Sequence, residues 1–357
     1  MIKSAFLSTG VAILEFMLIT IQDFWFANWT VGAADDLLLL IDTGSTDVYL
    51  NPGIYVPVTL PQTSMRTSPS PSLQRIPMAL ELRPYVPALF GTSHLTNRIQ
   101  IVGQIYKDVV QLDGTRLSVP QQPLGVTPLS SQPGFPHDGL VGFGGPGSAI
   151  NGSAWVQDLC AEGGLDQCRF GLALETDDTG VQYFGTVEHS RFDGALSVAP
   201  LFQYEGSPIM WALFGDIAYN GKVIVRDAEI ASDSGTTVIF GPVDDVAALF
   251  DAAGLQYLIV NSTNPAVPTT LTGYYPCDQP PPFGFGFPSI SNATTASENG
   301  NRNVSHESTV FNVLPSQLLQ NGTGNNCTAS IHGTDEFGGW IVGQAFFQGK
   351  YVESQFG

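Results

Sequence analysis

The fold of this chain is decided by two short stretches, Ile41-Asp42-Thr43-Gly44-Ser45-Thr46 and Ser232-Asp233-Ser234-Gly235-Thr236-Thr237. Each contains Asp, then Ser or Thr, then Gly, then Ser or Thr, and each follows a run of apolar or small residues. With ordinary residue usage this pattern is expected roughly 0.05 times in a chain of this length, so two chance copies are roughly a one-in-a-thousand event. The repetition therefore indicates a duplicated structural unit.

The spacing behind each stretch repeats as well. Gly142, in Leu-Val-Gly, lies 100 residues after Asp42, and Gly343, in Ile-Val-Gly, lies 110 residues after Asp233. A chain of 357 residues is long enough for two domains, each with its own core. We place the boundary in the segment 184–200, and we expect a possible signal segment over 1–21, an N-terminal lobe over 22–190 and a C-terminal lobe over 191–357.

The repeated residue types suit acid–base chemistry. Glycine lets each loop turn sharply and brings backbone amides near the carboxylate, and the neighbouring hydroxyl groups can donate hydrogen bonds to it. Two carboxylates in contact share one proton, which supplies a general acid and a general base in one site. Asp42 and Asp233 are therefore the candidate catalytic pair. The alternative interpretation is that each Asp only caps a turn.

Composition predicts a mostly β protein. The chain has 39 Gly and 25 Pro, 43% hydrophobic residues and only 13% charged residues, which is too apolar for disorder and too rich in turn formers for a helical bundle. Short apolar runs with strand spacing are found at 37–41, 99–102, 109–112, 170–174, 223–225, 238–240 and 340–342. The best helix candidates are 154–160 and 244–253.

Charge and residue spacing exclude several kinds of partner. The formal net charge of −19 makes nucleic acid and anionic membrane surfaces poor partners. The five histidines are scattered without metal spacing, and no cysteine pair has the spacing of a zinc site, so we expect no metal. The Gly-x-Gly-x-x-Gly match at 142–147 contains Pro146, which removes an amide donor, so we expect no dinucleotide cofactor either.

Several features favour the secretory pathway. Sequons for N-glycosylation occur at Asn28, Asn151, Asn261, Asn292, Asn303, Asn321 and Asn326. Four cysteines allow three disulfide pairings, and the sequence-local one, Cys160 with Cys168 and Cys277 with Cys327, closes the smallest loops. The apolar run 5–21 after Met-Ile-Lys fits a secretion signal, and 11–21 fits a buried strand equally well. The Pro-rich and then polar stretch 280–309 is expected to form a glycosylated surface loop, although Phe283, Phe285 and Phe287 within it suggest either a packed loop or a pocket lining.

From about Phe24 to its end the chain resembles the pepsin-like aspartic endopeptidases. The two stretches look like the active-site motifs of that family, and Asp138-Gly139-Leu140-Val141-Gly142 and Trp340-Ile341-Val342-Gly343 resemble its hydrophobic-hydrophobic-Gly elements. Other matches are Tyr183-Phe184-Gly185, Phe192-Asp193-Gly194-Ala195-Leu196, and the pair Cys277 and Cys327, which resembles the C-lobe disulfide.

The resemblance implies a bilobal β fold that cleaves extended polypeptides at acidic pH and is inhibited by pepstatin-type compounds. Within the motifs Thr43, Gly44, Ser45, Ser234, Gly235 and Thr236 would support the active-site loops: Thr43 and Ser234 would link them, and Ser45 and Thr236 would bind the outer carboxylate oxygens. The chain departs from the family at the flap, where no Tyr-Gly pair occurs. Phe90 and Gly91 are the candidate flap tip, with Tyr85 as the alternative.

Two other functions remain open at this point: a non-catalytic binding protein on the same fold, and a two-carboxylate glycosidase. We expect a monomer that is secreted or vacuolar and does not associate stably with membranes.

Overall fold

The computed structural model describes residues 14–21, 24–58, 77–82, 99–128, 134–145, 149, 152–177, 179–194, 196–204, 207–208, 210–262, 267–288 and 308–356. The chain divides into two compact units. Unit 1 comprises 1–85, 98–188 and 352–357, and unit 2 comprises 86–97 and 189–351. The division at Glu188 and His189 falls inside the segment where the sequence places the lobe boundary.

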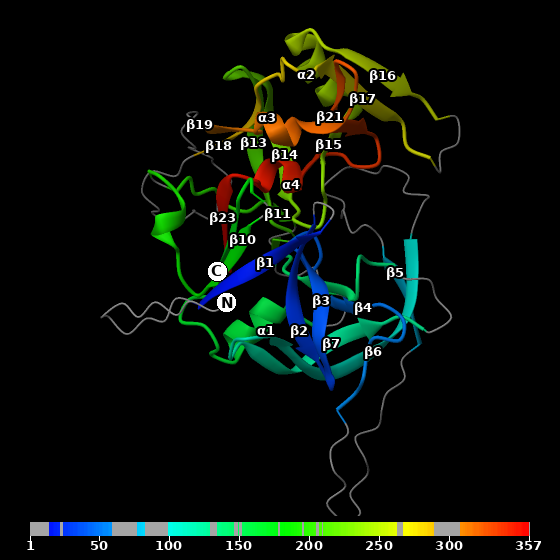
Figure 1. The fold of residues 1–357 in the computed structure, drawn as a ribbon, viewed down its shortest axis with the longest axis vertical. Helices are drawn as coiled ribbons and strands as arrows, with labels where there is room; N and C mark the ends of the chain where they lie inside the picture. The colour runs from blue at the N-terminus through cyan, green and yellow to red at the C-terminus, as the bar shows by residue number, and fades with distance from the viewer. Residues whose placement is uncertain are drawn as a thin grey trace, which may run out of the picture. The chain divides into compact units, whose positions relative to one another are not determined.

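Unit 1 is built on one large sheet (Figure 1). Its described strands run in the spatial order β23 (Lys350–Gln355), β9 (Arg169–Leu174), β10 (Gly180–Phe184), β1 (Leu14–Ile21), β2 (Phe24–Val31), β3 (Ala34–Asp42), β8 (Gly139–Gly142), β4 (Val48–Leu50), β7 (Ser118–Val126), β6 (Ile99–Leu112) and β5 (Pro77–Leu82), with β2 also paired to β6. Helix α1 (Trp155–Ala161) lies against β7.

Leu14–Ile21 forms strand β1, which pairs antiparallel with β10 and β2. The strand alternative therefore describes these residues. Residues 1–13 lie outside the described part of the chain, so a signal segment there stays a prediction.

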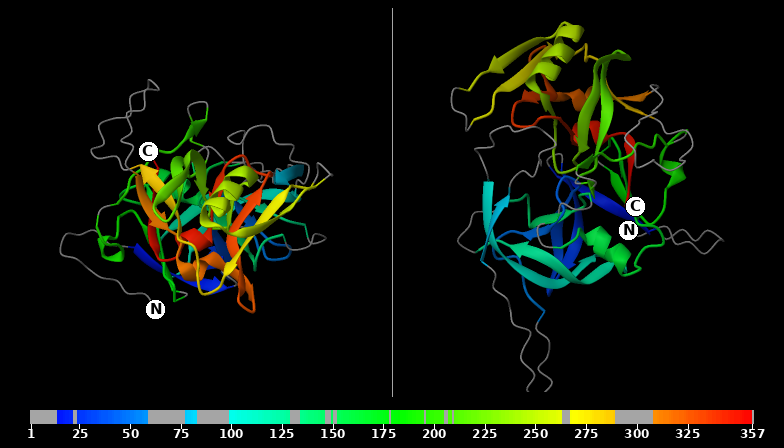
Figure 2. Two further views of the ribbon diagram at one scale, coloured as in Figure 1. Left: turned by 90° about the horizontal axis from the view of Figure 1, so that it is seen from above. Right: turned by 180° about the vertical axis from the view of Figure 1, so that it is seen from behind.

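Unit 2 contains a second large sheet, seen from two further sides in Figure 2. Its described strands run in the order β16 (Gln256–Val260), β17 (Thr270–Pro276), β21 (Asn326–Thr334), β15 (Ile239–Pro242), β22 (Trp340–Val342), β14 (Lys222–Ser232), β13 (Ala212–Tyr219), β18 (Phe283–Pro288) and β19 (Ser308–Asn312), and β20 (Leu319–Thr323) pairs with β21. A separate hairpin joins β11 (Gln203–Tyr204) to β12 (Ser207–Pro208). The helical segments of unit 2 are η1 (His189–Arg191), α2 (Val243–Ala253), α3 (Pro315–Leu318) and α4 (Gln344–Phe347).

The mostly β fold with a few short helices is the one the composition predicts. The predicted strands and both predicted helices are present, with the runs 99–102 and 109–112 merged into the single strand β6. Among the described residues no helix combines the length and the apolarity needed to cross a membrane.

The expectation of a surface loop over 280–309 is wrong for its first part. Phe283–Pro288 forms β18, and Phe283 and Phe285 are fully buried in the core of unit 2. Alternation explains this burial, because successive residues of a strand face opposite sides of the sheet. On the other face a Cβ at Gly284 would lie 2.7 Å from a side-chain oxygen of Asn312, so only glycine lets β19 approach. Residues 289–307, which carry Asn292 and Asn303, lie outside the described residues.

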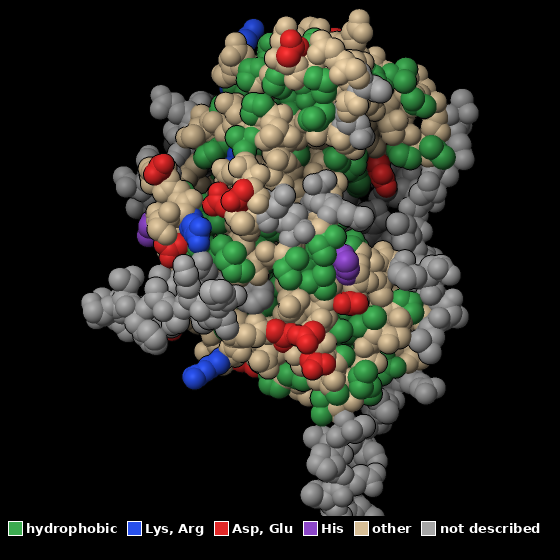
Figure 3. Space-filling model, in the orientation of Figure 1, with side chains coloured by type: hydrophobic (Ala, Val, Ile, Leu, Met, Phe, Trp, Pro, Cys, Tyr) green, Lys and Arg blue, Asp and Glu red, His purple; other side chains and the backbone are tan. Residues whose placement is uncertain are grey.

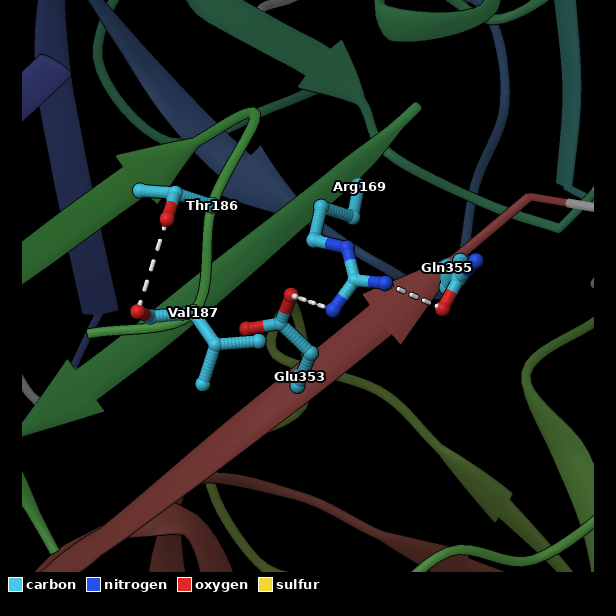
Figure 4. A network of polar contacts seen from close by, with 5 residues as sticks. All are labelled: Arg169, Thr186, Val187, Glu353 and Gln355. Atoms are coloured by element: carbon cyan, nitrogen blue, oxygen red, sulfur yellow. Dashed lines mark hydrogen bonds and ion pairs between the residues drawn. The ribbon is translucent and has the colours of Figure 1, made fainter. Parts of the chain in front are cut away.

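The C-terminal residues from Val352 belong to unit 1, whereas the predicted C-terminal lobe extends over 191–357. From Val352 onward β23 lies beside β9 at the edge of the unit 1 sheet. There Arg169 lies 3.6 Å from a carboxylate oxygen of Glu353 and donates a 2.6 Å hydrogen bond to Gln355 (Figure 4). The amide of Phe356 also bonds to the carbonyl of Cys168. Side-chain and backbone contacts thus hold the C-terminal residues to unit 1.

Candidate active site

The first candidate carboxylate lies at the end of a buried strand in unit 1. Strand β3 is apolar from Leu37 to Ile41 and ends at Asp42, where the parallel strand β8 places Gly142 directly opposite. The amide of Phe143 donates a 2.7 Å hydrogen bond to the Asp42 carbonyl. The backbone of Asp42 is therefore fixed by the sheet, and its side chain can be positioned by the loop that follows.

That loop supplies three hydrogen bonds to the carboxylate. The amides of Gly44 and Ser45 donate to Oδ1 at 2.8 and 3.3 Å, and the Ser45 hydroxyl donates to Oδ2 at 2.6 Å. Donors on both oxygens stabilise an ionised carboxylate and fix its plane. The Ser45 hydrogen bond is the one that the resemblance predicts.

Unit 2 repeats this arrangement around Asp233. Strand β14 ends at Ser232, opposite Val342 of the parallel strand β22, and the Asp233 amide bonds to the Val342 carbonyl at 3.0 Å. The Gly235 amide donates to Oδ1 at 2.8 Å, and the Thr236 hydroxyl donates to Oδ2 at 2.7 Å. The two Asp-Ser/Thr-Gly stretches therefore hold their carboxylates alike in two separate units, with the glycine amide on Oδ1 and the next hydroxyl on Oδ2.

The repeated glycines beneath the turns are required by close packing. A Cβ at Gly142 would lie 2.7 Å from the Asp47 carbonyl oxygen, and a Cβ at Gly343 would lie 2.3 Å from the Val238 carbonyl oxygen, in each unit the carbonyl five residues after the Asp. Backbone atoms cannot move aside as a flexible side chain can. The spacing of 100 and 110 residues that the sequence shows thus reflects one packing contact made twice.

A cluster of buried aromatic rings packs around Phe143, next to the glycine that contacts the first turn. Phe143, one residue after Gly142, is fully buried among Trp29, Trp155, Phe170 and Phe184, with ring centroids 5.2 to 6.3 Å away. The Trp155 indole donates to the Val110 carbonyl at 2.9 Å and so ties α1 to β6. Large buried rings of this kind dominate core packing, so the end of β8 beside the first turn is held firmly.

Tyr49, in the short strand β4, is also buried. Its ring stacks on Phe135 at 5.4 Å, and a Cβ on Gly125 would lie 2.6 Å from it. Burial, with the charge of Asp47 and a hydrogen bond to that carboxylate, raises the pKa of Tyr49, so the phenol stays protonated.

Two buried side-chain amides outside the sequence motifs hold the backbone in place, one at the second turn and one at the segment before β8. In unit 2 the Gln344 side chain, 1% exposed, donates through Nε2 to the carbonyl of Ser234 inside the second turn. In unit 1 the Asn51 side chain, 2% exposed, donates to the carbonyls of Phe135 and His137 at 2.8 and 2.6 Å. The available signal was positional: Gln344 directly follows Ile-Val-Gly, and Asn51 ends an apolar strand.

The structure describes the predicted disulfide cysteines but not the candidate flap residues. The structure joins Cys160 to Cys168 and Cys277 to Cys327, the same pairs as the sequence-local pairing. The candidate flap residues Phe90 and Gly91 and the alternative Tyr85 lie outside the described residues. Strands β5 and β6, which pair antiparallel from Pro77 to Leu82, are described on either side of that segment.

The sequons also differ in environment. Asn261 and Asn326 are exposed, and Asn28 is partly buried in β2. The side chains of Asn151 and Asn321, like those of Asn292 and Asn303, lie outside the described part. Within the residues that the structure describes, no group of His, Cys, Asp or Glu side chains is arranged to hold a metal ion.

Comparison with known proteins agrees with this geometry. The family model described as eukaryotic aspartyl protease matches residues 93–356, which include Asp233 and begin after Asp42. An aspartic protease of Phaffia rhodozyma is 28% identical over 256 residues, covering 70% of this chain and 56% of that protein. The secreted aspartyl protease 1 of Malassezia globosa is 26% identical over 50% of this chain and 37% of its own length, and the embryonic pepsinogen of Gallus gallus is 24% identical over 70% and 63%. The chain thus spans between a third and two thirds of the length of these relatives. With nearly three quarters of its residues inside the family model, the chain belongs to the eukaryotic aspartyl protease family.

Proposed function

We propose that this protein is an aspartic endopeptidase in which Asp42 and Asp233 act together on one water molecule. The observation that carries the proposal is the repeated turn. In each unit the Asp carboxylate accepts a backbone amide from the glycine two residues on and a hydroxyl from the residue three residues on. A turn that only reverses the chain needs no such matched carboxylate in both units.

In the proposed mechanism the two carboxylates meet and hold one proton between them, because two like charges in contact cannot both ionise easily. The ionised carboxylate takes a proton from water as the water oxygen attacks a peptide carbonyl carbon. The protonated carboxyl group gives its proton to the carbonyl oxygen, which yields a tetrahedral diol. Collapse of the diol, with a proton passing to the nitrogen, breaks the peptide bond. Thr43 and Ser234 are proposed to link the two turns.

The mechanism sets the pH range. Activity requires one proton on the pair, so it should fall as the pH rises past the higher macroscopic pKa of the pair. The 32 acidic residues against 13 basic ones add repulsion near neutral pH that fades toward the isoelectric point of 4.3. We expect maximal activity on polypeptides below about pH 5.

We also propose that the protein is a secreted monomer. Two disulfides and exposed sequons suit an oxidising compartment, and one relative is named as a secreted aspartyl protease. A vacuolar destination is the alternative. Fractionating a culture of the source cells and detecting the protein in the medium or in vacuoles distinguishes the two.

Casein cleavage at pH 3 to 5, with and without pepstatin, tests the proposed activity. We expect cleavage by the wild type, inhibition by pepstatin, and loss of cleavage in Asp42→Asn and in Asp233→Asn. Asp177→Asn, at an exposed turn between β9 and β10, is the matched control and should keep full activity. Either active-site variant retaining near-native turnover while folded would refute the paired mechanism.

The same assay separates the two other functions. A binding protein on this fold would leave casein intact while still binding peptide or pepstatin. A two-carboxylate glycosidase would hydrolyse a chromogenic glycoside and would not respond to pepstatin.

A further inference from the structure

The end of the unit 2 sheet is an apolar strand. Strand β16 pairs with β17 on one side and, among the described residues, is the terminal strand of that sheet. Its sequence is Gln-Tyr-Leu-Ile-Val, and Leu258, Ile259 and Val260 are 55%, 38% and 55% exposed. Because adjacent residues of a strand face opposite sides, apolar side chains are exposed on both faces of this edge.

The segment that carries β16 and β17 has few charges: the Asp251 carboxylate of α2 accepts a 3.1 Å hydrogen bond from the Tyr257 hydroxyl, but the segment contributes no charged side chain of its own. From Ala252 through Cys277 the chain contains no Asp, Glu, Lys, Arg or His, although the whole chain carries 45 side chains of Asp, Glu, Lys and Arg. Hydrophobic side chains are visible in the upper right of Figure 3, the region where Figure 1 places β16 and β17. The residues of this segment therefore add no repulsion of their own between copies of a protein with net charge −19.

The usual protections of an edge strand are missing from β16. Natural proteins blunt such edges with charged residues, proline or a β-bulge. None of the five residues of β16 is charged or proline, and all five pair with β17 without a shift of register. An edge of this kind is a template on which another strand can pair, so a secreted protein needs some other means of covering it.

A modification signal lies directly beside the strand. Asn261 is the first residue after β16, its side chain is exposed, and Asn261-Ser262-Thr263 is a sequon. An N-linked glycan at this position is bulky and strongly hydrated. The strand is short, roughly 17 Å for five residues, so a glycan attached at its end can reach back along it.

We propose that Asn261 carries an N-linked glycan that covers the apolar edge strand β16 and prevents a second copy of the chain from pairing with it. The proposal rests on the secretory route proposed above and is independent of proteolytic activity. Sugar rings have apolar C–H faces that can lie on Leu258 and Val260 while their hydroxyl groups remain in water.

Without a glycan, β16 of one copy can pair with β16 of a second copy of the chain. An antiparallel pair centred on Leu258 sets Leu258 opposite Leu258, Tyr257 opposite Ile259 and Gln256 opposite Val260. Leu258 and Ile259 then meet an apolar or aromatic partner, while Val260 faces Gln256, and cross-strand pairs of the first type stabilise a sheet. Loss of the glycan should therefore convert the monomer to a dimer in which the two sheets join at β16.

The experiment compares the secreted full chain with three variants made in the same eukaryotic host. Mass spectrometry of the tryptic or chymotryptic peptide containing Asn261 reports whether the site is occupied. Light scattering after size exclusion, at pH 5, reports the mass of wild type, Asn261→Gln, Asn326→Gln and the double variant Asn261→Gln with Leu258→Lys. Asn326 is the control, since its side chain is also exposed but its exposed neighbours are Gly324 and Asn325; the same peptide mapping reports whether this second site is occupied.

We expect an occupied Asn261, monomers for the wild type and Asn326→Gln, and a shift to dimer for Asn261→Gln. The double variant should return to monomer, because the two-fold pairing would set Lys opposite Lys. Trimming the glycans of the folded wild type with an endoglycosidase should produce the same dimer, and trimming Leu258→Lys should not, which removes any dependence on how the variants fold. An unoccupied Asn261, a monomeric Asn261→Gln, or association that Leu258→Lys does not prevent would each overturn the proposal. Casein cleavage, measured in parallel, separates this outcome from a failure of the proposed function.

Discussion

Removal of the Cys277–Cys327 disulfide should destabilise unit 2 more than removal of Cys160–Cys168 destabilises unit 1. Cys327 is buried in the core of unit 2 and lies opposite Tyr275 in the pairing of β17 with β21. The bond closes a loop that spans β18, β19, α3 and β20, with a separation of 50 residues between the two cysteines. The Cys160–Cys168 bond spans only 8 residues, from the last turn of α1 to the start of β9.

The loop lengths set the magnitudes. In the chain-entropy model, closing the longer loop stabilises the fold by about 4 kcal/mol at 25 °C, and closing the shorter loop by about 2.5 kcal/mol. For units of this size each kcal/mol corresponds to roughly 2–4 °C in melting temperature. The double variant Cys277→Ala with Cys327→Ala should therefore melt roughly 8–16 °C lower, and the other pair roughly 5–10 °C lower.

Differential scanning calorimetry at pH 5 measures both losses, and replacing each pair together leaves no free thiol to form new disulfides. Circular dichroism before the scan checks that each variant is folded. Equal losses, or a larger loss for the Cys160–Cys168 variant, would refute the loop-length argument and would indicate that local packing around each bond decides its effect.

Three further outcomes are expected from single substitutions. Burial lowers the pKa of Lys350 to about 8, and its ammonium lies 4.6 Å from the Phe346 ring with no hydrogen-bond partner among the described residues. Below pH 8 the folded state must keep this buried charge, so Lys350→Met should raise the free energy of unfolding at pH 5 by up to about 3 kcal/mol. In denaturant titrations this gain should shrink above pH 8 and be absent above about pH 10.5. Gly254 ends α2 at φ 69° with open space around its Cβ position. Because alanine is strained at this positive φ, Gly254→Ala should lower the free energy of unfolding in urea by about 1–2 kcal/mol, and an unchanged value would contradict this reasoning. Asn51→Ala should cost about 3 kcal/mol, because two carbonyls and two amides of the segment before β8 lose a buried partner, whereas a loss below 1 kcal/mol would show that water replaces it.

The local chemistry of the two turns could be predicted from the sequence alone. Asp, Gly and a hydroxyl residue at fixed offsets predict the turn, because the loop's hydrogen bonds to the carboxylates of Asp42 and Asp233 come from two or three residues along the chain. The repetition of the pattern in a chain rich in strand and turn formers also predicted two related β lobes. These features depend on contacts that are short in sequence, so residue order reveals them directly.

Long-range packing decided the rest. Phe283 and Phe285 lie in a Pro- and Gly-rich stretch that predicts a loop, and they are core residues because β13 and β19 pair on either side of them. The C-terminal residues belong to unit 1 because β9 offers them a free strand edge. The hydrogen bonds of Gln344 to the second turn and of Asn51 to the segment before β8 join residues that are 110 and more than 80 positions apart. No pattern within a single segment contains such partners, because they meet only when separate strands pair and their side chains exclude water together.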